Sequence, residues 1–179
     1  MQYEGLICAD ALAWLEGRSD VGSVVTSLPD AEEIGADPDA WRAWFLRAAV
    51  LCFRAASSDA PVLFYQTDRK AGGGIESKAA LVLQSASECD ARPLWHKIVL
   101  RRTVGAVDLH RPGFTHMIAF GRGARPGKAT PDGIEGGPML YPNAMGLKAA
   151  SFAVRFAGQS SSRIGAPFCG RETRRSPTL

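Results

Sequence analysis

Short runs of β-branched and aromatic residues alternate along this chain with longer amphipathic windows, and this alternation constrains the fold most. The runs predict strands at residues 22–26, 61–66, 94–100 and 114–120, and the windows predict helices at 9–16, 39–56 and 75–89. Strands separated by helices are typical of an α/β protein with parallel pairs. Only the connection at residues 103–113 is too short for a helical crossover. The pattern therefore predicts a mixed, mostly parallel sheet that ends in an antiparallel hairpin.

The 179 residues suit a single domain. Residues 121–143 are rich in Gly and Pro and predict a long exposed loop, followed by a helix at 144–156 and a strand at 163–166. The polar, basic segment 171–179 has no core-facing pattern, and we expect a disordered tail there. No apolar run reaches the length of a membrane span and no leader is readable, so the expected location is cytoplasmic.

Charge is distributed unevenly. Residues 1–60 carry ten acids against four bases, whereas residues 91–128 carry eight bases against Asp108 alone. A stretch this basic can follow a phosphate backbone, although an ordinary solvated face is the alternative. The four cysteines form no Cys-x-x-Cys pair and the three histidines lack ligand spacing, so no metal site is predicted. The Trp95-His96 pair is typical of packing rather than catalysis.

Polar residues and turns follow three of the predicted strands. In open α/β sheets ligands bind beyond the carboxyl ends of the strands, so these positions are candidate site residues. The three segments are Ser27-Leu28-Pro29-Asp30, Gln66-Thr67-Asp68-Arg69-Lys70 and Ala166-Pro167-Phe168-Cys169-Gly170.

Taken in this order, the segments resemble the S-adenosylmethionine-dependent amino-methyltransferases of DNA and RNA that have a permuted motif order. Ala9-Asp10 is similar to that family's N-terminal element, Ser27-Leu28-Pro29-Asp30 to its catalytic motif, and the segment from Pro167 to Thr173 to its cofactor loop. The resemblance implies a Rossmann-like methyltransferase fold. It also implies cofactor contacts from Asp10, Pro167, Phe168, Cys169, Gly170 and Thr173.

The same resemblance implies a role for the catalytic segment. In the family, a polar side chain and the neighbouring backbone carbonyl accept hydrogen bonds from an exocyclic amino group, and an aromatic residue stacks on the base. Ser27 and Pro29 take the polar and turn-forming positions, Leu28 replaces a proline, and Asp30 replaces the aromatic. Gln66, Asp68 and Lys70 are then expected to line the substrate edge.

The expected function is methyl transfer from S-adenosylmethionine to a nitrogen of a nucleic-acid base, with RNA slightly preferred over DNA because no separate target-recognition domain is readable. The cofactor loop departs from the family pattern, with Ala166 in place of an acid and Glu172 in place of a glycine. The expected continuation of the fold after this loop is also missing, which predicts a C-terminally incomplete fold and weak cofactor binding. Two alternatives stay open: a catalytically inactive remnant, and a non-enzymatic nucleic-acid-binding domain that uses residues 91–128.

Overall fold

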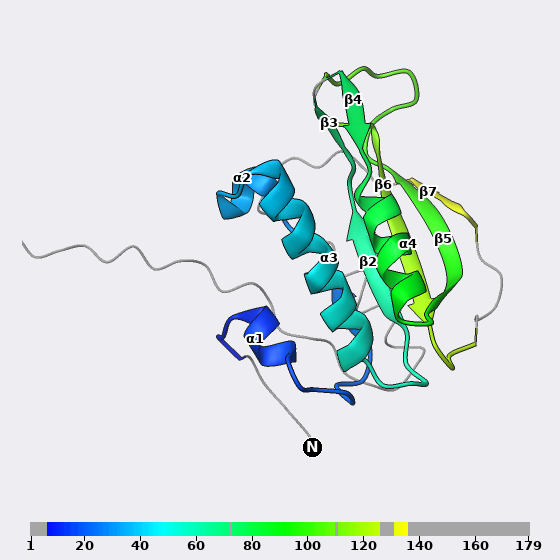
Figure 1. Cartoon of the computed structure of the whole chain (residues 1–179). Coiled ribbons are helices and arrows are strands. Elements are labelled where there is room, and N and C mark those ends of the chain that lie inside the picture. The colour runs from blue at the N-terminus through cyan, green and yellow to red at the C-terminus, as the bar shows by residue number, and fades with distance from the viewer. Residues whose placement is uncertain (1–6, 72, 110, 126–130, 136–179) are drawn as a thin grey trace, which may run out of the picture.

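The computed structural model describes residues 7–71, 73–109, 111–125 and 131–135. Within them a five-stranded sheet has the order β1-β2-β6-β5-β7 (Figure 1). Its strands are β1 (Val24–Thr26), β2 (Val62–Gln66), β6 (Phe114–Gly121), β5 (Arg92–Leu100) and β7 (Gly133–Glu135). The four strands predicted from the sequence therefore lie in one sheet, which confirms the α/β expectation.

Strand directions confirm the mixed sheet and its antiparallel pair. β1 is parallel to β2 and β5 is parallel to β7, whereas β6 is antiparallel to both of its neighbours, β2 and β5. Four strands thus run one way and β6 runs the other. The carboxyl ends of β1, β2 and β5 and the amino end of β6 consequently meet at one edge of the sheet.

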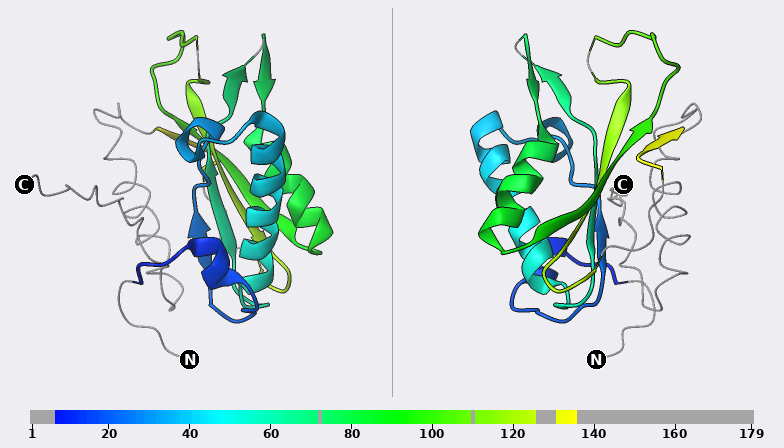
Figure 2. Two further views of the ribbon diagram at one scale, coloured as in Figure 1. Left: turned by 60° about the vertical axis from the view of Figure 1, so that its left-hand side comes forward. Right: turned by 90° about the vertical axis from the view of Figure 1, so that its right-hand side faces the viewer.

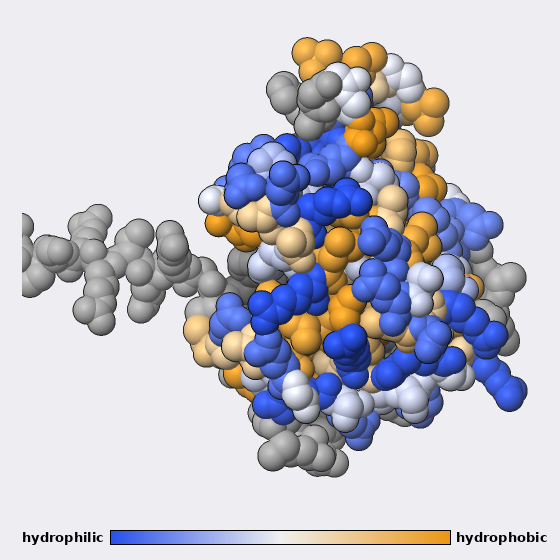
Figure 3. All heavy atoms as spheres, viewed as in Figure 1, coloured by the Kyte–Doolittle hydropathy of each residue, from blue (hydrophilic) through white to orange (hydrophobic). Residues whose placement is uncertain are grey.

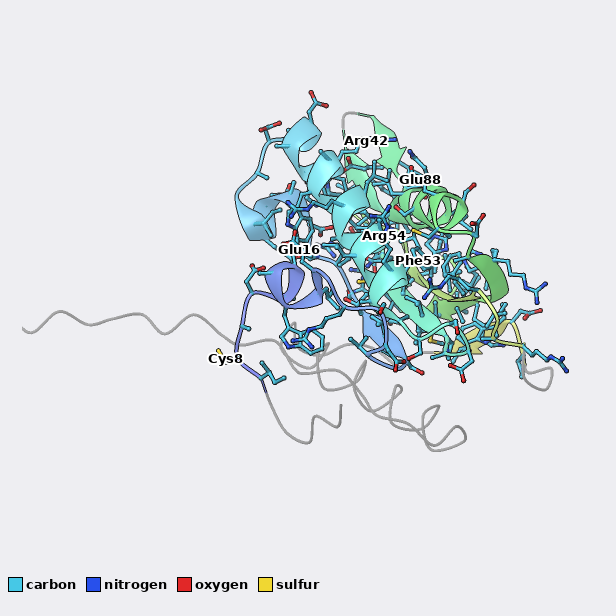
Figure 4. The ribbon with its side chains drawn as sticks, turned by 60° about the horizontal axis from the view of Figure 1, so that its bottom comes forward. Cys8, Glu16, Arg42, Phe53, Arg54 and Glu88 are labelled. Carbon is cyan, nitrogen blue, oxygen red and sulfur yellow. The ribbon has the colours of Figure 1, made fainter. Side chains whose placement is uncertain are left out.

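Two helices, α3 (Pro38–Ala55) and α4 (Lys78–Glu88), cover one face of this sheet (Figure 2). α3 begins where sequence signals favour it, because the Asp37 side chain accepts from the first-turn N–H groups and Pro38 stands at the first helical position. The apolar side chains of α3 then pack against the strands. Phe53 of α3 (labelled in Figure 4) lies with its ring centroid 5.3 Å from that of Phe64 and 5.2 Å from that of Phe120.

Two short helices precede α3. α1 (Ala11–Leu15) is capped by Asp10, and it lies against α3 (Figure 1). α2 (Ala31–Ile34) was not expected from the sequence. It begins with a capping box in which Asp30 and Glu33 satisfy each other's backbone N–H groups, and that Asp-x-x-Glu spacing is a readable helix-start signal.

The helix expected at residues 75–89 begins later, at Lys78. Residues Arg69–Ala71 form β3 and Gly74–Glu76 form β4, an antiparallel hairpin that stands apart from the main sheet. Gly73 has a φ of +78°, which suits the turn of this hairpin and which other residues rarely adopt. Ser77 then caps α4. The chain therefore reverses direction between β3 and β4 instead of leading directly into a helix.

Within the segment 121–143, which was expected to be an exposed loop, the described residues include strand. Gly121 closes β6, and Gly133–Glu135 form β7 beside β5. The face opposite the helices carries a smaller apolar cluster made of Leu63, Val99, Met117 and Ala119. The predicted helix at 144–156, the strand at 163–166 and the tail at 171–179 lie outside the described residues. In the described part, no helix combines the length and apolarity needed to cross a membrane.

Candidate catalytic edge

The segment after β1 is fixed from several directions. Gln66 lies fully buried at the end of β2. With its amide oriented to pair with the backbone of Leu28, Nε2 donates to the Leu28 carbonyl at 3.2 Å and Oε1 accepts from the Leu28 N–H at 2.6 Å. The indole Nε1 of Trp41 donates to the carbonyl of Pro29 at 3.0 Å. Leu28 is buried, whereas Ser27 is exposed. The exposed Ser27 is therefore carried on a rigid segment.

Asp30 is buried and holds two cations. Lys78 Nζ lies 2.6 Å from one carboxylate oxygen, and Arg111 Nη2 lies 2.5 Å from the other. Lys78 is itself buried, whereas the Arg111 side chain is 38% exposed. Lys78 Nζ also lies 3.5 Å from the Leu28 carbonyl. A buried carboxylate needs such partners, because an unpaired charge in this position would be strongly destabilising.

Asp68, after β2, anchors α4. Its carboxylate accepts from the N–H of Ala79 at 3.2 Å and from the Ser77 hydroxyl at 2.9 Å, and it lies 3.2 Å from His116 Nε2. Burial raises the pKa of the Asp68 carboxyl, but the hydrogen bonds from His116, Ala79 and Ser77 together outweigh it and leave the pKa below the usual value. Asp68 is therefore held as a carboxylate at the start of a helix.

His116 extends this network across the sheet. Its Nδ1 lies 2.9 Å from Nε2 of His96, on the neighbouring strand β5. An ionised Asp68 favours the proton on Nε2 of His116, which leaves Nδ1 to accept from His96. Burial lowers the pKa of the His96 imidazole, and the neighbouring His116 lowers it further. His96 is exposed, so its place in the structure is this polar chain rather than the packing expected of the Trp95-His96 pair.

Lys70 connects the β3–β4 hairpin with the loop at residues 101–113. Its Nζ donates to the carbonyl of Asp108 at 2.6 Å. The Asp108 carboxylate in turn accepts from the Arg102 guanidinium and from the Arg111 N–H. Since Arg111 also binds Asp30, this loop is tied both to the hairpin and to the segment after β1.

The structure brings Leu28, Pro29, Asp30, Gln66 and Asp68 to one edge, with exposed Ser27 on the same segment. Asp10 is different: its carboxylate accepts from the Ala13 N–H at 2.8 Å, so it serves its own helix, which lies against α3. Pro167, Phe168, Cys169, Gly170 and Thr173 lie outside the described residues.

Sequence reasoning missed Lys78, Arg111, His116 and Trp41 as members of this edge. A lysine among the apolar residues of α4 is a signal that could have identified Lys78, because a buried amine requires an acidic partner. Arg111 stands in a loop without periodicity and offered no such signal.

The basic stretch 91–128 does not form one surface in the part of the chain that is described. Lys97 is buried and donates to the Pro131 carbonyl at 2.6 Å, whereas Arg122 donates to the Ala56 carbonyl after α3. Arg111 is engaged with Asp30. These cations lie in separate surroundings, so a phosphate backbone would meet only part of this charge. Among the described residues, no group of three or more His, Cys, Asp or Glu side chains is arranged to hold a metal ion.

Comparison with known proteins found no matching family model and no matching curated protein. Solved structures do match. One is a protein of Thermus thermophilus described as a candidate DNA modification methylase, with 18% identity and a TM-score of 0.51 over 90% of this chain and 66% of the other. Another is the PvuII cytosine-N4-specific DNA methyltransferase, with 13% identity and a TM-score of 0.59 over 80% of this chain and 61% of the other.

This chain thus spans somewhat less than two thirds of the length of those structures. The likeness extends over most of the present sequence at low identity. Together with the mixed sheet and its antiparallel β6, it shows that the chain has the methyltransferase fold.

Proposed function

We propose that this chain is an S-adenosylmethionine-dependent methyltransferase that acts on an exocyclic amino group of a DNA base. The observation that carries the proposal is Ser27: an exposed hydroxyl directly after a parallel strand, on a segment fixed by Gln66 and Trp41. The two similar structures are of DNA-modifying proteins, so they support DNA and give no support to the preference for RNA expected from the sequence.

Ser27 fits a position beside the target amine. Its hydroxyl oxygen would accept a hydrogen bond from the amino group and so orient the nitrogen lone pair. Leu28, Pro29 and Asp30 would act as positioning residues, because their backbone and side-chain groups are already engaged within the protein. When bound, S-adenosylmethionine supplies a methyl group on a good leaving group, so positioning is the main task of the protein.

For the cofactor we propose contacts from Pro167, Phe168, Cys169, Gly170 and Thr173, as the resemblance implies. The geometry gives Asp10 a helix-capping role, which does not favour a direct cofactor contact. For the substrate edge we propose Gln66, Asp68 and Lys70, of which Gln66 and Asp68 act by shaping the edge because both are buried.

The test uses the full chain, unmethylated duplex DNA and S-adenosylmethionine labelled in the methyl group. We expect label in DNA, and Ser27→Ala should lower the rate by about tenfold or more, because one hydrogen bond that positions the nucleophile is lost. Ser87→Ala is the matched control, since Ser87 is an exposed serine on α4. Absence of cofactor binding in a calorimetric titration would instead favour the inactive remnant.

A further inference from the structure

Exposed apolar side chains gather on two neighbouring projections above the candidate catalytic edge. One projection is the β3–β4 hairpin, with Ile75 65% exposed; the other is the loop at residues 101–113, with Val104, Val107 and Leu109 each at least 80% exposed. Of the six large hydrophobic residues exposed in the described part of the chain, these four are the most exposed. Figure 3 shows apolar atoms collected on this end of the molecule. A cluster of this kind marks an interaction surface.

The projections have a defined geometry. The base of the 101–113 loop is closed by a hydrogen bond from the Arg101 N–H to the Gly113 carbonyl at 2.8 Å, and a turn links the Ala106 N–H to the Thr103 carbonyl. Lys70 joins the hairpin to this loop through the Asp108 carbonyl. The apolar tips are therefore presented by an internally bonded loop and a hairpin tied to it.

Positive charge flanks the apolar tips. The loop at residues 101–113 carries three bases against Asp108 alone, and the hairpin carries Arg69 and Lys70 against Glu76. Arg102 is half exposed, and Arg111 is 38% exposed. Apolar side chains between cations fit nucleic acid better than a neutral protein surface, because the cations face phosphates while apolar side chains enter between base steps.

We propose that these two projections form a docking surface for duplex DNA, in which Val104, Val107 and Leu109 act as a wedge that unstacks the base to be modified. The inference rests on the proposed function, since a base must leave the stack before its amino group can be methylated in an enzyme site. Arg111 connects the wedge to the edge through its ion pair with Asp30. Docking at the loop therefore positions the duplex relative to the segment that carries Ser27.

The wedge is tested by replacing its apolar residues without changing charge. In the full chain, Val104→Ser/Val107→Ser/Leu109→Ser is compared with Ile34→Ser/Leu83→Ser, which alters two exposed apolar residues on α2 and α4. The probe is a duplex oligonucleotide with 2-aminopurine at the target position, measured without cofactor. We expect the triple variant to bind about tenfold more weakly, from lost apolar burial, and to lose the fluorescence increase that reports unstacking. The control should bind as the original chain does.

The basic residues beside the wedge allow a second measurement, the salt dependence of DNA binding. Arg102→Ala should lower the salt dependence of binding by about one phosphate contact. Equal affinity and equal fluorescence for the triple variant and the original chain would overturn the proposal. A triple variant that loses self-association but keeps DNA affinity would also overturn it, and would assign the surface to a second copy of the chain.

These outcomes are separable from the proposed function. Binding and unstacking with no methyl transfer would leave the docking surface standing and contradict the proposed activity. Methyl transfer at the original rate by the triple variant would support the proposed activity and contradict the docking surface. Ser27→Ala serves as a further comparison, because it should reduce methyl transfer while the fluorescence increase that reports unstacking persists.

Discussion

Gln66 and Leu28 are joined by a two-point hydrogen bond that links the end of β2 to the segment following β1. The Gln66 side chain thereby replaces strand pairing at the point where β1 has ended. Because Gln66 is fully buried, the backbone groups of Leu28 have little access to water as alternative partners.

Replacement of Gln66 by leucine should be strongly destabilising. The variant keeps the side-chain volume but leaves the Leu28 N–H without its partner and weakens the bonding of its carbonyl, so we expect a loss of about 2–4 kcal/mol in the free energy of unfolding. Urea denaturation measures this loss. Gln84→Leu, at an exposed position on α4, should change stability by less than about 0.5 kcal/mol; equal losses in the two variants would contradict the prediction.

The Asp30–Lys78 pair should show strong coupling. Because both side chains are buried, Asp30→Ala or Lys78→Ala alone should cost about 3–5 kcal/mol, and the double variant should cost clearly less than the sum. The exposed pair Arg47–Glu16 is the matched control, with a coupling of at most about 1 kcal/mol. Additive losses at Asp30 and Lys78 in a double-mutant cycle would contradict the buried pairing.

Asp68 should contribute to the acid sensitivity of the fold. Its folded pKa lies below the unfolded value of 3.8, so its stabilising contribution is present above that pH and is lost as the pH falls through the folded pKa. Asp68→Asn should therefore be less stable than the original chain at pH 7, with a difference that shrinks below about pH 4. Unfolding free energies measured from pH 7 to pH 2 check this, and a constant difference would exclude the explanation.

Protonation of His96 should affect the stability of the fold at a higher pH than protonation of Asp68. Its folded pKa is below the unfolded value of 6.5, so the unfolded chain binds the proton more readily and stability falls as the pH drops from that value through the folded pKa. His96→Gln should remove this part of the pH dependence. Titration of the His96 ring by NMR gives the folded pKa directly, and a value above 6.5 would contradict the prediction.

Cys52 should be inert in the folded protein. Burial raises the pKa of its thiol to about 12, so almost no reactive thiolate is present at neutral pH. Cys8 is exposed. Alkylation followed by mass mapping should modify Cys8 quickly and Cys52 only at the rate of unfolding, and comparable labelling of both thiols in the folded chain would show that Cys52 is accessible.

The elements with strong local signals could be predicted from the sequence. α3 has a capping aspartate, a proline at its first position and a regular apolar stripe, so its bounds differ from the expected ones by a single residue at each end. The positions after the predicted strands also indicated Leu28, Asp30, Gln66 and Asp68 as candidate site residues, and the structure places them at one edge of the sheet. Those predictions depend on periodicity and on the direction of parallel strands, which are properties of local sequence.

The features that could not be predicted from the sequence depend mostly on contacts between distant segments. Nothing local about Arg111 indicates that it meets Asp30, which lies 81 residues earlier. The β3–β4 hairpin was missed because its short strands pair only with each other, while the apolar periodicity of α4 dominates the surrounding window. Helix α2 is four residues long, too short for periodicity to identify.

The position of β6 has a consequence for the chain as it is synthesised. β6 lies between β2 and β5 at the middle of the sheet, yet it is made some fifty residues after β2. Until residues 114–121 leave the ribosome, one side of the apolar sequence Val-Leu-Phe-Tyr in β2 has no strand to pair with. Nascent chains that stop before β6 therefore present an open, apolar strand edge, which favours aggregation or capture by chaperones.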